Sequence, residues 1–473
     1  MAERASSTHC AMLLEALRPG EKDAPALAGE RRCDLAIVGG GYLGLWTAIE
    51  AKSKAPALAV AVIEADICGS GASGRNSGMA LPYWTKFEAL AAQCGSGEAL
   101  ELCDASLTAL DEIDALTRQH GIDIEFRRSG WLWAAASARQ AGRWRGVMEG
   151  LAKAGRAPFR ELDRAGVQGL LDAPGLLAGA YDPAPATLHP GKLARGLRRI
   201  ALALGVQLFE RSPLRRLKRG PRPAVVTPAG RLGAERVVLA LNAWSMAVPE
   251  LRSGILVITS DDLVSAPAEA FLQRHRWRNG PIVTDSALFV SGWRSTADGR
   301  VVAGVTGGKV GFGSLAGQRF AGRTPREAAI LGALRRGFGS VEGLSVASSW
   351  RGPIDRTQTG LPRFGRLPGA PAVLFGYGFS GNGIVGCRLG GRILASLALG
   401  RQDRWAGCGL VVEPGRWLPP EPLRYLGAHL VRWAVRRQDG ADLAGRPAGP
   451  LVRRLAALAP GGVVTTKGVG RQR

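Results

Sequence analysis

The sequence predicts an α/β fold built on a Rossmann-like parallel sheet, and three features of its first quarter predict it. A short apolar strand at Asp34 to Val38 leads into the glycine-rich turn Gly39 to Gly44. A helical stretch follows from Leu45 to Lys52, and a second apolar strand runs from Ala59 to Ile63. Strand, tight turn, helix and second strand in this order are typical of a parallel sheet covered by helices. The 473 residues, 46% of them hydrophobic, allow about two or three structural units with sizeable cores.

The composition is that of a soluble globular protein of a reducing compartment. No apolar run approaches the ~18 residues that span a bilayer, and the charges of Glu3, Arg4 and Glu15 make the amino terminus a poor signal peptide. The seven cysteines are scattered and form no C-x-x-C pair, so neither a disulfide framework nor a zinc or other metal site is indicated. We therefore expect a cytoplasmic protein.

The net charge of +23 is concentrated in two segments. Residues 191–236 hold twelve basic and two acidic side chains, and residues 421–473 hold ten and three. Such an excess fits nucleic acid, anionic lipid or an acidic substrate. Because 191–236 shows no recognisable nucleic-acid-binding module and no aromatic residues interleaved with the basic ones, we expect a solvated arginine-rich surface and no nucleic-acid partner.

The turn Gly39 to Gly44 matches the G-x-G-x-x-G dinucleotide fingerprint in its proper context. Gly39 allows the tight turn, Gly41 lets a pyrophosphate approach the backbone, and Gly44 lets the helix pack close to the strand. Glu64 falls 20 residues after Gly44, where a carboxylate accepts hydrogen bonds from an adenosine ribose and disfavours the 2′-phosphate of NADP. NAD and FAD share this fingerprint, so other segments must distinguish them.

The loop after Glu64 indicates FAD. Residues Ala65 to Gly78 combine several glycines, one guanidinium and small polar groups, a composition that can wrap a large flat ligand. This loop resembles the G-A-S-x-R-N-x-G-like segment of the D-amino-acid-oxidase-like superfamily of FAD-dependent amine oxidoreductases. The resemblance implies that the amino-terminal residues holding FAD are Gly39, Gly41, Tyr42, Leu43, Gly44, Glu64, Ala65, Gly71, Ala72, Ser73, Arg75, Asn76, Ser77 and Gly78.

Three later segments agree with the resemblance. Ser349 to Pro362 looks like the family's W-x-G-x-x-D-x-T-x-x-x-P stretch, and Val373 to Ile384 reads as a strand and glycine loop before a helix at about Val385 to Leu399. Amides at that helix start would stabilise a reduced flavin. Arg236 to Ser245 resembles the strand that returns to the FAD domain, with Asn242 where many relatives have glycine; asparagine tolerates positive φ. The implied FAD contacts here are Asn242, Ala243, Trp244, Gly378, Ser380, Gly381, Asn382, Gly383 and Ile384.

The resemblance covers about residues 33–400 and implies a two-domain architecture like that of glycine oxidase. A discontinuous FAD-binding domain would comprise 30–110, 189–249 and 346–400, and a substrate domain with an antiparallel sheet would comprise 111–188 and 250–345. Within the latter, Leu288 to Trp293 and Arg300 to Gly304 form a hairpin-like pair around the turn residues Asp298-Gly299. Residues 401–473 form a basic, partly helical carboxyl-terminal extension.

The family reaction oxidises the C–N bond of a primary or secondary amine by hydride transfer to flavin N5, and water hydrolyses the imine. No cysteine lies in 345–365, where sarcosine-oxidase-like members attach FAD, so we expect a non-covalent cofactor. Asn382 and Val385 replace the histidine and lysine of those members, which speaks against a simple sarcosine-like carboxylate. The electron acceptor would be oxygen or, in a dehydrogenase, a quinone. The alternative that is not an enzyme is a catalytically idle FAD-binding subunit of a larger complex.

A closer likeness is to the aminophosphonate oxidoreductase and γ-glutamylputrescine oxidase subgroup. It is carried by Gly44 to Ile49, Tyr83 to Phe87, Asp355 to Pro362 and Pro420 to Gly427. The substrate would then be an amino acid, a polyamine derivative or an aminophosphonate, and an anionic substrate would need guanidinium or ammonium groups. The corresponding candidates are Arg75, Lys86 and Arg356, with His189 as a further substrate contact, although a structural role is the preferred interpretation of His189.

The carboxyl-terminal extension predicts a basic amphipathic helix from Pro422 to Gln438. Leu423, Leu426, Leu430 and Trp433 recur at helical spacing, and arginines follow another face. We expect this apolar stripe to pack on its own protein rather than on a membrane surface, which is the alternative.

Overall fold

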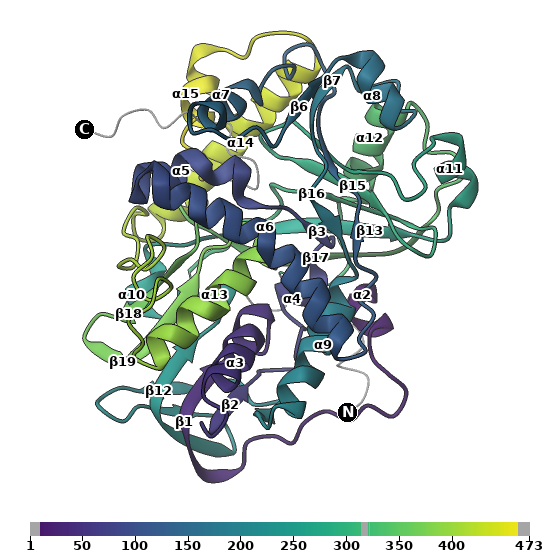
Figure 1. Ribbon diagram of the computed structural model, residues 1–473. Coiled ribbons are helices and arrows are strands. Elements are labelled where there is room, and N and C mark those ends of the chain that lie inside the picture. The colour runs from purple at the N-terminus through teal and green to yellow at the C-terminus, as the bar shows by residue number, and fades with distance from the viewer. Residues whose placement is uncertain (1–9, 314–319, 321, 462–473) are drawn as a thin grey trace.

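The computed structural model describes residues 10–313, 320 and 322–461, and two eight-stranded sheets form its frame (Figure 1). The last twelve residues of the carboxyl-terminal extension, 462–473, lie outside the described residues. Between them the two sheets confirm the predicted mixed architecture of a parallel nucleotide-binding sheet and a largely antiparallel one. Among the described residues, none of the helices combines the length and the apolar character that crossing a bilayer requires.

The first sheet has a parallel centre of five strands in the order β9, β2, β1, β12 and β19. Their bounds are Gln207–Phe209 for β9, Val60–Ile63 for β2, Gly29–Val38 for β1, Gly230–Leu239 for β12 and Ala370–Tyr377 for β19. Antiparallel strands β10 (Arg216–Lys218), β11 (Ala224–Val226) and β18 (Arg363–Leu367) extend it. The predicted order of strand, turn, helix and strand is confirmed, because α3 (Tyr42–Lys54) connects the paired strands β1 and β2.

The second sheet runs in the order β17, β13, β16, β15, β14, β5, β7, β6, and β14 with β5 is its parallel pair. Its strands are β5 (Trp131–Ala135), β6 (Arg160–Leu162), β7 (Ala178–Asp182), β13 (Leu256–Ser265), β14 (Ile282–Asp285), β15 (Ser291–Ser295), β16 (Val301–Val305) and β17 (Val346–Arg356). The predicted hairpin is confirmed, since β15 and β16 pair antiparallel around Asp298-Gly299. Strand β17, at the start of the third predicted FAD-domain segment, pairs with β13 of this sheet.

A small sheet and the helices complete the fold. Strands β3 (Met79–Ala80), β8 (Ala186–Thr187) and β4 (Arg127–Arg128) form a three-stranded sheet. Helices α3 and α13 lie side by side over the parallel sheet (Figure 1). Besides α3, the helices are α2 (Ala11–Glu15), α4 (Ala72–Arg75), η1 (Tyr83–Lys86), α5 (Phe87–Cys94), α6 (Ser96–Gln119), α7 (Arg145–Lys153), α8 (Arg164–Leu170), α9 (Pro190–Ala203), η2 (Asn242–Ala247), α10 (Pro249–Arg252), α11 (Glu269–Arg274), α12 (Glu327–Phe338), α13 (Gly383–Ala398), α14 (Leu423–Leu443) and α15 (Pro450–Ala456).

The expectation of a solvated basic surface at 191–236 is wrong for two of its arginines. Arg195 and Arg198 are buried, and both donate hydrogen bonds to the buried carboxylate of Glu210, at 3.3 Å and 2.9 Å. Arg195 also donates to Glu21 at 2.8 Å. Burial pushes the pKa of Glu210 upward, but the hydrogen bonds from Arg198 and from backbone amides outweigh it and lower that pKa to about 2. This part of the charge excess is therefore an internal ion-pair cluster that ties α9 to β9.

The predicted carboxyl-terminal helix is confirmed as α14, but the expected packing of its apolar stripe is wrong. The helix packs on the protein through a neighbouring face, where Ala434 and Val435 are buried. The stripe faces solvent, with exposed fractions of 61% for Leu423, 60% for Leu426, 48% for Leu430 and 44% for Trp433. Helical spacing predicted the apolar stripe correctly. It could not predict which face of α14 packs on the protein, because the smaller residues Ala434 and Val435 make that contact.

Candidate functional site

The glycine-rich turn between β1 and α3 has the steric requirements that its spacing predicts. Gly39 has a φ of 115°, in the left-handed region that favours glycine. A Cβ on Gly44 would lie 1.9 Å from the Gly39 carbonyl oxygen, so only glycine lets the helix start this close to the strand end. A Cβ on Gly41 would lie 2.8 Å from Ser73 Oγ. Neither Gly41 nor Gly44 therefore has room for a larger side chain.

Glu64 closes the same turn through the backbone. Its carboxylate accepts hydrogen bonds from the Gly40 amide at 2.7 Å and from the Asp66 amide at 3.0 Å. Burial raises the pKa of this carboxyl, against the effect of these two amides. Ala65, the next residue, is exposed at the end of β2. The predicted ribose-binding carboxylate thus lies directly beside the glycines of the fingerprint.

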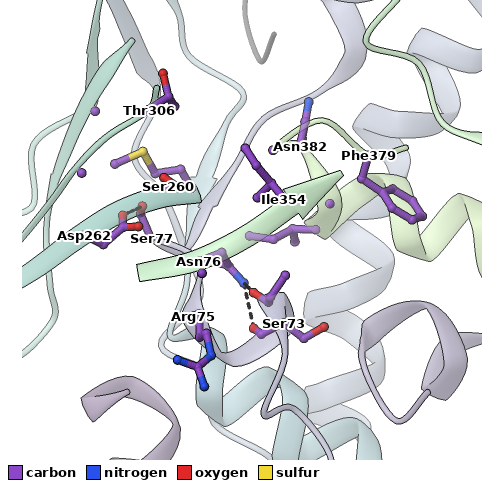
Figure 2. Close-up of a pocket in the computed structure, with 18 of the residues that line it drawn as sticks. Ser73, Arg75, Asn76, Ser77, Ser260, Asp262, Thr306, Ile354, Phe379 and Asn382 are labelled. Carbon is purple, nitrogen blue, oxygen red and sulfur yellow. Dashed lines mark hydrogen bonds between the residues drawn. The ribbon is translucent and has the colours of Figure 1, made fainter. Parts of the chain in front are cut away.

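The loop at 70–78 is folded by its own polar groups. Ser73 Oγ accepts a hydrogen bond from the Tyr42 amide at 2.8 Å, which attaches α4 to the start of α3. The Asn76 side chain donates to the Ser73 carbonyl oxygen at 2.7 Å. Arg75 donates its Nε to the Ser70 carbonyl oxygen at 2.8 Å, and Figure 2 shows its guanidinium directed away from the other labelled residues. Arg75 therefore stabilises the loop.

Asp355 on β17 joins two further turns. Its carboxylate accepts hydrogen bonds from the Gly378 amide and, at 3.3 Å, from the side chain of Asn242. Asn242 has a φ of 48°, so the left-handed backbone expected of an asparagine in place of glycine is confirmed. Gly381 lies at φ 94° in the loop after β19. Burial raises the pKa of Asp355 to about 6.

These turns converge on one cavity of about 1210 Å³, including its open mouth, between the two sheets (Figure 2). Eleven of the predicted cofactor residues line it: Tyr42, Ala72, Ser73, Arg75, Asn76, Ser77, Asn242, Gly381, Asn382, Gly383 and Ile384. The other predicted ones lie outside its lining: Gly39, Gly41, Leu43, Gly44, Glu64, Ala65, Gly71, Gly78, Ala243, Trp244, Gly378 and Ser380. Segments more than 300 residues apart in the sequence thus share one wall.

The cavity wall fits a flavin ring with its electron-rich carbonyl edge. Asn382 Nδ2 is buried and has no hydrogen-bond partner among the described residues. The same residue precedes α13, whose first turn has no side-chain cap, and Gly383 and Ile384 of that turn line the cavity. An unpaired amide group and an open helix start are donors for a group that gains negative charge. Cys387 also lines the cavity, and burial raises its pKa far above the usual range, so its thiol is protonated.

Asp262 is a candidate site residue that the sequence analysis missed. On β13, Ser260 and Asp262 line the cavity, whereas Asp261 points to the other face and pairs with Arg326 at 2.9 Å. Asp262 accepts a hydrogen bond from Ser77 Oγ, and burial raises the pKa of its carboxyl to about 7. The signal was two adjacent aspartates inside a buried strand, where alternation must turn one of them to each face.

Lys86, Arg356 and His189, the predicted catalytic residues, do not line this cavity. Lys86 is buried and donates to the Gly360 carbonyl oxygen; burial, and next the charge of Arg356, lower its pKa to about 7. Burial lowers the pKa of Arg356 to about 10, and its guanidinium donates to the Gly461 carbonyl oxygen at 3.1 Å.

His189 is the N-cap of α9. Its Nδ1 accepts the Lys192 amide at 3.2 Å, and its Nε2 lies 3.4 Å from a carboxylate oxygen of Glu15. These contacts are structural, in line with the preferred interpretation of the lone histidine.

Comparisons with known proteins agree with this geometry. Residues 34–397 match the family model described as FAD dependent oxidoreductase. The probable oxidoreductase OrdL of Haemophilus influenzae is 27% identical over 80% of this chain and 86% of its own length. The γ-glutamylputrescine oxidoreductase of Escherichia coli is 26% identical over 79% of this chain and 85% of its own length. The crystal structure of glycine oxidase from Geobacillus kaustophilus shares the fold, with a TM-score of 0.67 and 20% identity over 82% of this chain and all of that one.

Proposed function

Because the chain belongs to the FAD-dependent oxidoreductase family, we propose that it oxidises the C–N bond of a cationic amine that carries no anionic group near the reacting carbon. One observation carries the proposal: the buried carboxyl of Asp262 faces the cavity that the cofactor turns line. A carboxylate inside a largely apolar cavity binds an ammonium group strongly, because little water competes for either charge. The similarity to an enzyme named for γ-glutamylputrescine supports an amine of this kind.

The charges around the cavity favour a cation over an amino acid or an aminophosphonate. The lining includes the carboxyl groups of Asp262 and Asp355, and Arg75 is the cation among the lining residues. The guanidinium of Arg75 is committed to the Ser70 carbonyl oxygen. Lys86 and Arg356, the other candidates for an anionic group, lie outside this lining. A carboxylate or phosphonate bound here would meet like charge without a free partner.

We assign the cofactor to the turns of the first sheet, held without a covalent bond. The start of α3 with Gly41 would hold the pyrophosphate, and Asn382 with the first turn of α13 would donate to the flavin carbonyl edge. When bound, FAD supplies the acceptor for the hydride. Asp262 binds the amine nitrogen and takes up its ammonium proton, because only the neutral amine can release a hydride from the adjacent carbon. The apolar walls contributed by residues such as Ile354 and Phe379 exclude water from the reacting carbon. The protonated thiol of Cys387 is not a nucleophile for covalent attachment.

Anaerobic titration of the purified yellow protein tests the proposal. We expect diamines and alkylamines to bleach the flavin absorbance, and amino acids and aminophosphonates to leave it unchanged. Bleaching by aminophosphonates in preference to alkylamines would contradict the cationic substrate. If no amine bleached a fully loaded protein, the catalytically idle FAD-binding subunit would be the better interpretation.

The seven cysteines add a proposal about location. All seven are free thiols in the structure, and six of them are buried. We infer from their scattered positions that the protein works in a reducing compartment such as the cytoplasm. Secretion with an intact disulfide would contradict this.

A further inference from the structure

A second cavity, of about 1130 Å³ including its mouth, lies under the carboxyl-terminal helices. Its walls are mostly apolar. From the sheet it is lined by Leu256, Ile258, Leu288, Phe289, Gly307 and Val310, and from the carboxyl-terminal segment mainly by Trp417, Leu418, Val431, Val435, Ala456 and Ala459. No part of the amine chemistry proposed above uses these residues.

The second cavity continues the first one along the same strand. Leu256 and Ile258 line the second cavity, and Ser260 and Asp262, on the same face of β13, line the first. The wall between them is thin, because consecutive residues face opposite cavities at three further places: Phe289 and Val290, Thr306 and Gly307, and Asp355 and Arg356. A ligand in the second cavity would therefore lie next to the flavin cavity.

Three arginines line this apolar space, Arg356, Arg424 and Arg432, and Arg432 donates its Nε to the Gly307 carbonyl oxygen at 3.0 Å. Arg424 is buried, and its Nη1 has no hydrogen-bond partner among the described residues, while its Nε donates to the Pro419 carbonyl oxygen at 3.2 Å. Arg356 donates one hydrogen bond, to the Gly461 carbonyl oxygen at 3.1 Å, as far as the described residues show. A buried donor without a partner is costly, so such groups indicate a ligand with oxygen acceptors.

The outer face of the two helices above this cavity is apolar and cationic. Besides the stripe on α14, Leu451 on α15 and Leu458 beyond it are exposed. The exposed charges of these helices are those of Arg436, Arg437, Arg453 and Arg454.

The acidic side chains of α14 form hydrogen bonds and ion pairs with the rest of the protein. Asp439 accepts the amides of Leu288 and Phe289 at 2.8 Å and 3.0 Å, and Asp442 pairs with Arg139 and Arg143. A surface of leucine, tryptophan and arginine without exposed acid is complementary to an anionic lipid surface.

The mouth of the second cavity opens on this same surface. Leu423 and Leu458 both line the cavity, yet 61% and 65% of these side chains remain exposed. They are therefore rim residues, and a molecule dissolved in a lipid layer beneath α14 and α15 would enter between them. Both helices lie together at one end of the molecule, away from the parallel sheet (Figure 1).

We propose that the second cavity binds a quinone from an anionic lipid surface on which α14 and α15 lie, and that this quinone is the electron acceptor. The inference rests on the proposed function, which leaves two electrons on the cofactor. In the balanced step, the quinone takes these two electrons and two protons and leaves as quinol, while the cofactor returns to its oxidised form. Arg356 and Arg424 donate hydrogen bonds to the quinone carbonyl oxygens, and the apolar walls hold the ring.

Vesicle sedimentation with the full chain tests the surface. We expect the protein to sediment with vesicles of phosphatidylcholine and phosphatidylglycerol and to stay in solution with phosphatidylcholine alone. The double variant Leu426→Ser/Leu430→Ser should weaken this binding at least about tenfold. The matched control is Leu202→Ser, because Leu202 is also exposed, at 42%, but lies on α9. Equal binding of both variants, or no binding at all, would overturn the surface assignment.

Quenching of tryptophan fluorescence reports quinone binding without turnover, and comparison with Trp417→Phe identifies the part that comes from Trp417, one of twelve tryptophans, which lines the cavity. We expect ubiquinone-1 to quench this fluorescence in the FAD-loaded protein, and Ala428→Phe, which fills the cavity from α14, to raise the dissociation constant at least about tenfold. Binding of oleate but not of ubiquinone-1 would overturn the quinone in favour of a fatty acid. Reduction of the flavin by amine in the absence of oxygen reports on the proposed function separately: if it succeeds while added ubiquinone-1 does not reoxidise the flavin, only the present inference fails.

Discussion

Ser77 Oγ donates a hydrogen bond to the carboxylate of Asp262, although 185 residues separate the two in the sequence. Ser77 lies in the glycine-rich loop of the first sheet, and Asp262 lies on β13 of the second. The bond therefore connects the cofactor loop to the wall that would hold the substrate. It also places the buried acid of the cavity where both partners of the reaction would meet.

The first prediction concerns this carboxyl directly. Asp262→Asn removes the charge but keeps the size, so we expect the dissociation constant of a cationic amine to rise roughly 10- to 100-fold, the loss of a charge-assisted hydrogen bond. Anaerobic flavin bleaching against amine concentration measures it. The control is Thr306→Val, which changes another cavity residue without changing charge. Unchanged amine affinity in Asp262→Asn would remove Asp262 from the site.

The pH dependence of amine binding follows from the same group. Burial raises the pKa of Asp262 to about 7, so the carboxyl becomes neutral as the pH falls below that value. Amine affinity should therefore be full above pH 7 and decline below it, with the decline absent in Asp262→Asn. The stability of the protein depends on pH in the opposite direction. Between the ordinary pKa of an aspartate and about 7, the native state holds a proton on Asp262 that the unfolded chain has released. The contribution of Asp262 to the free energy of unfolding therefore decreases as the pH rises. Calorimetric binding and urea unfolding from pH 5 to 8 measure both.

A third prediction tests the glycine fingerprint. Gly44→Ala would bring a Cβ to 1.9 Å from the Gly39 carbonyl oxygen, so we expect loss of bound flavin and destabilisation by about 3 kcal/mol or more. Gly146→Ala is the matched control on α7, because a Cβ there meets nothing within 4 Å. It should gain about 0.5–1 kcal/mol and keep its flavin. Flavin absorbance per protein and thermal unfolding are the measurements, and a fully loaded Gly44→Ala protein would refute the steric argument.

The buried ion-pair cluster predicts acid sensitivity. Glu210→Gln removes the carboxylate that Arg195 and Arg198 share and leaves Glu21 as their acidic partner, which should cost about 3 kcal/mol at neutral pH. Since the pKa of Glu210 is lowered to about 2, its contribution is complete above its ordinary pKa and is lost as the pH falls toward 2. Urea unfolding between pH 7 and pH 3 should show a shallower decline for Glu210→Gln than for the natural chain. Parallel declines would mean that the cluster contributes no pH dependence.

Lys86 gives the fifth prediction. With its pKa lowered to about 7, the unfolded chain holds a proton between pH 7 and 10.5 that the native state does not, so stability from this group rises with pH in that range. Lys86→Met should stabilise the protein at pH 7 by about 1 kcal/mol or more and flatten this rise. Because Lys86 lies outside the cavity lining, we expect flavin reduction by amine to keep its rate. A large loss of that rate in a stable Lys86→Met protein would restore Lys86 as a catalytic candidate.

The sequence predicted the parts of the fold that depend on local pattern. The strand–turn–helix at Gly39, the hairpin around Asp298-Gly299 and the positive φ at Asn242 each follow from a few neighbouring residues, and the structure confirms them. The family resemblance supplied the convergence of distant turns, which no spacing could give. Within the site, the residues of the glycine loops were predicted, and 11 of them line the cavity.

What the sequence could not supply was the direction of side chains in three dimensions. Arg75 sits in the right loop, but its guanidinium turns to a backbone carbonyl oxygen. Asp262 lies in a strand that reads as core, and only the pairing of β13 shows that it faces the cavity. The stripe from Leu423 to Trp433 has an obvious period, yet the contact that buries the other face depends on long-range packing.

The strand order of the parallel sheet also determines how late in translation the nascent chain can complete this sheet. Val38 of β1 pairs with Leu239 of β12, and Leu239 pairs with Phe375 of β19. A ribosome that adds about 5–20 residues per second takes roughly 20 to 70 s to travel from the first of these residues to the last. One edge of β1 stays unpaired until β12 has been made, and the residues of β12 that pair with β19 then stay unpaired until β19 follows. The emerging polypeptide must therefore be shielded from intermolecular strand exchange until most of it has been translated.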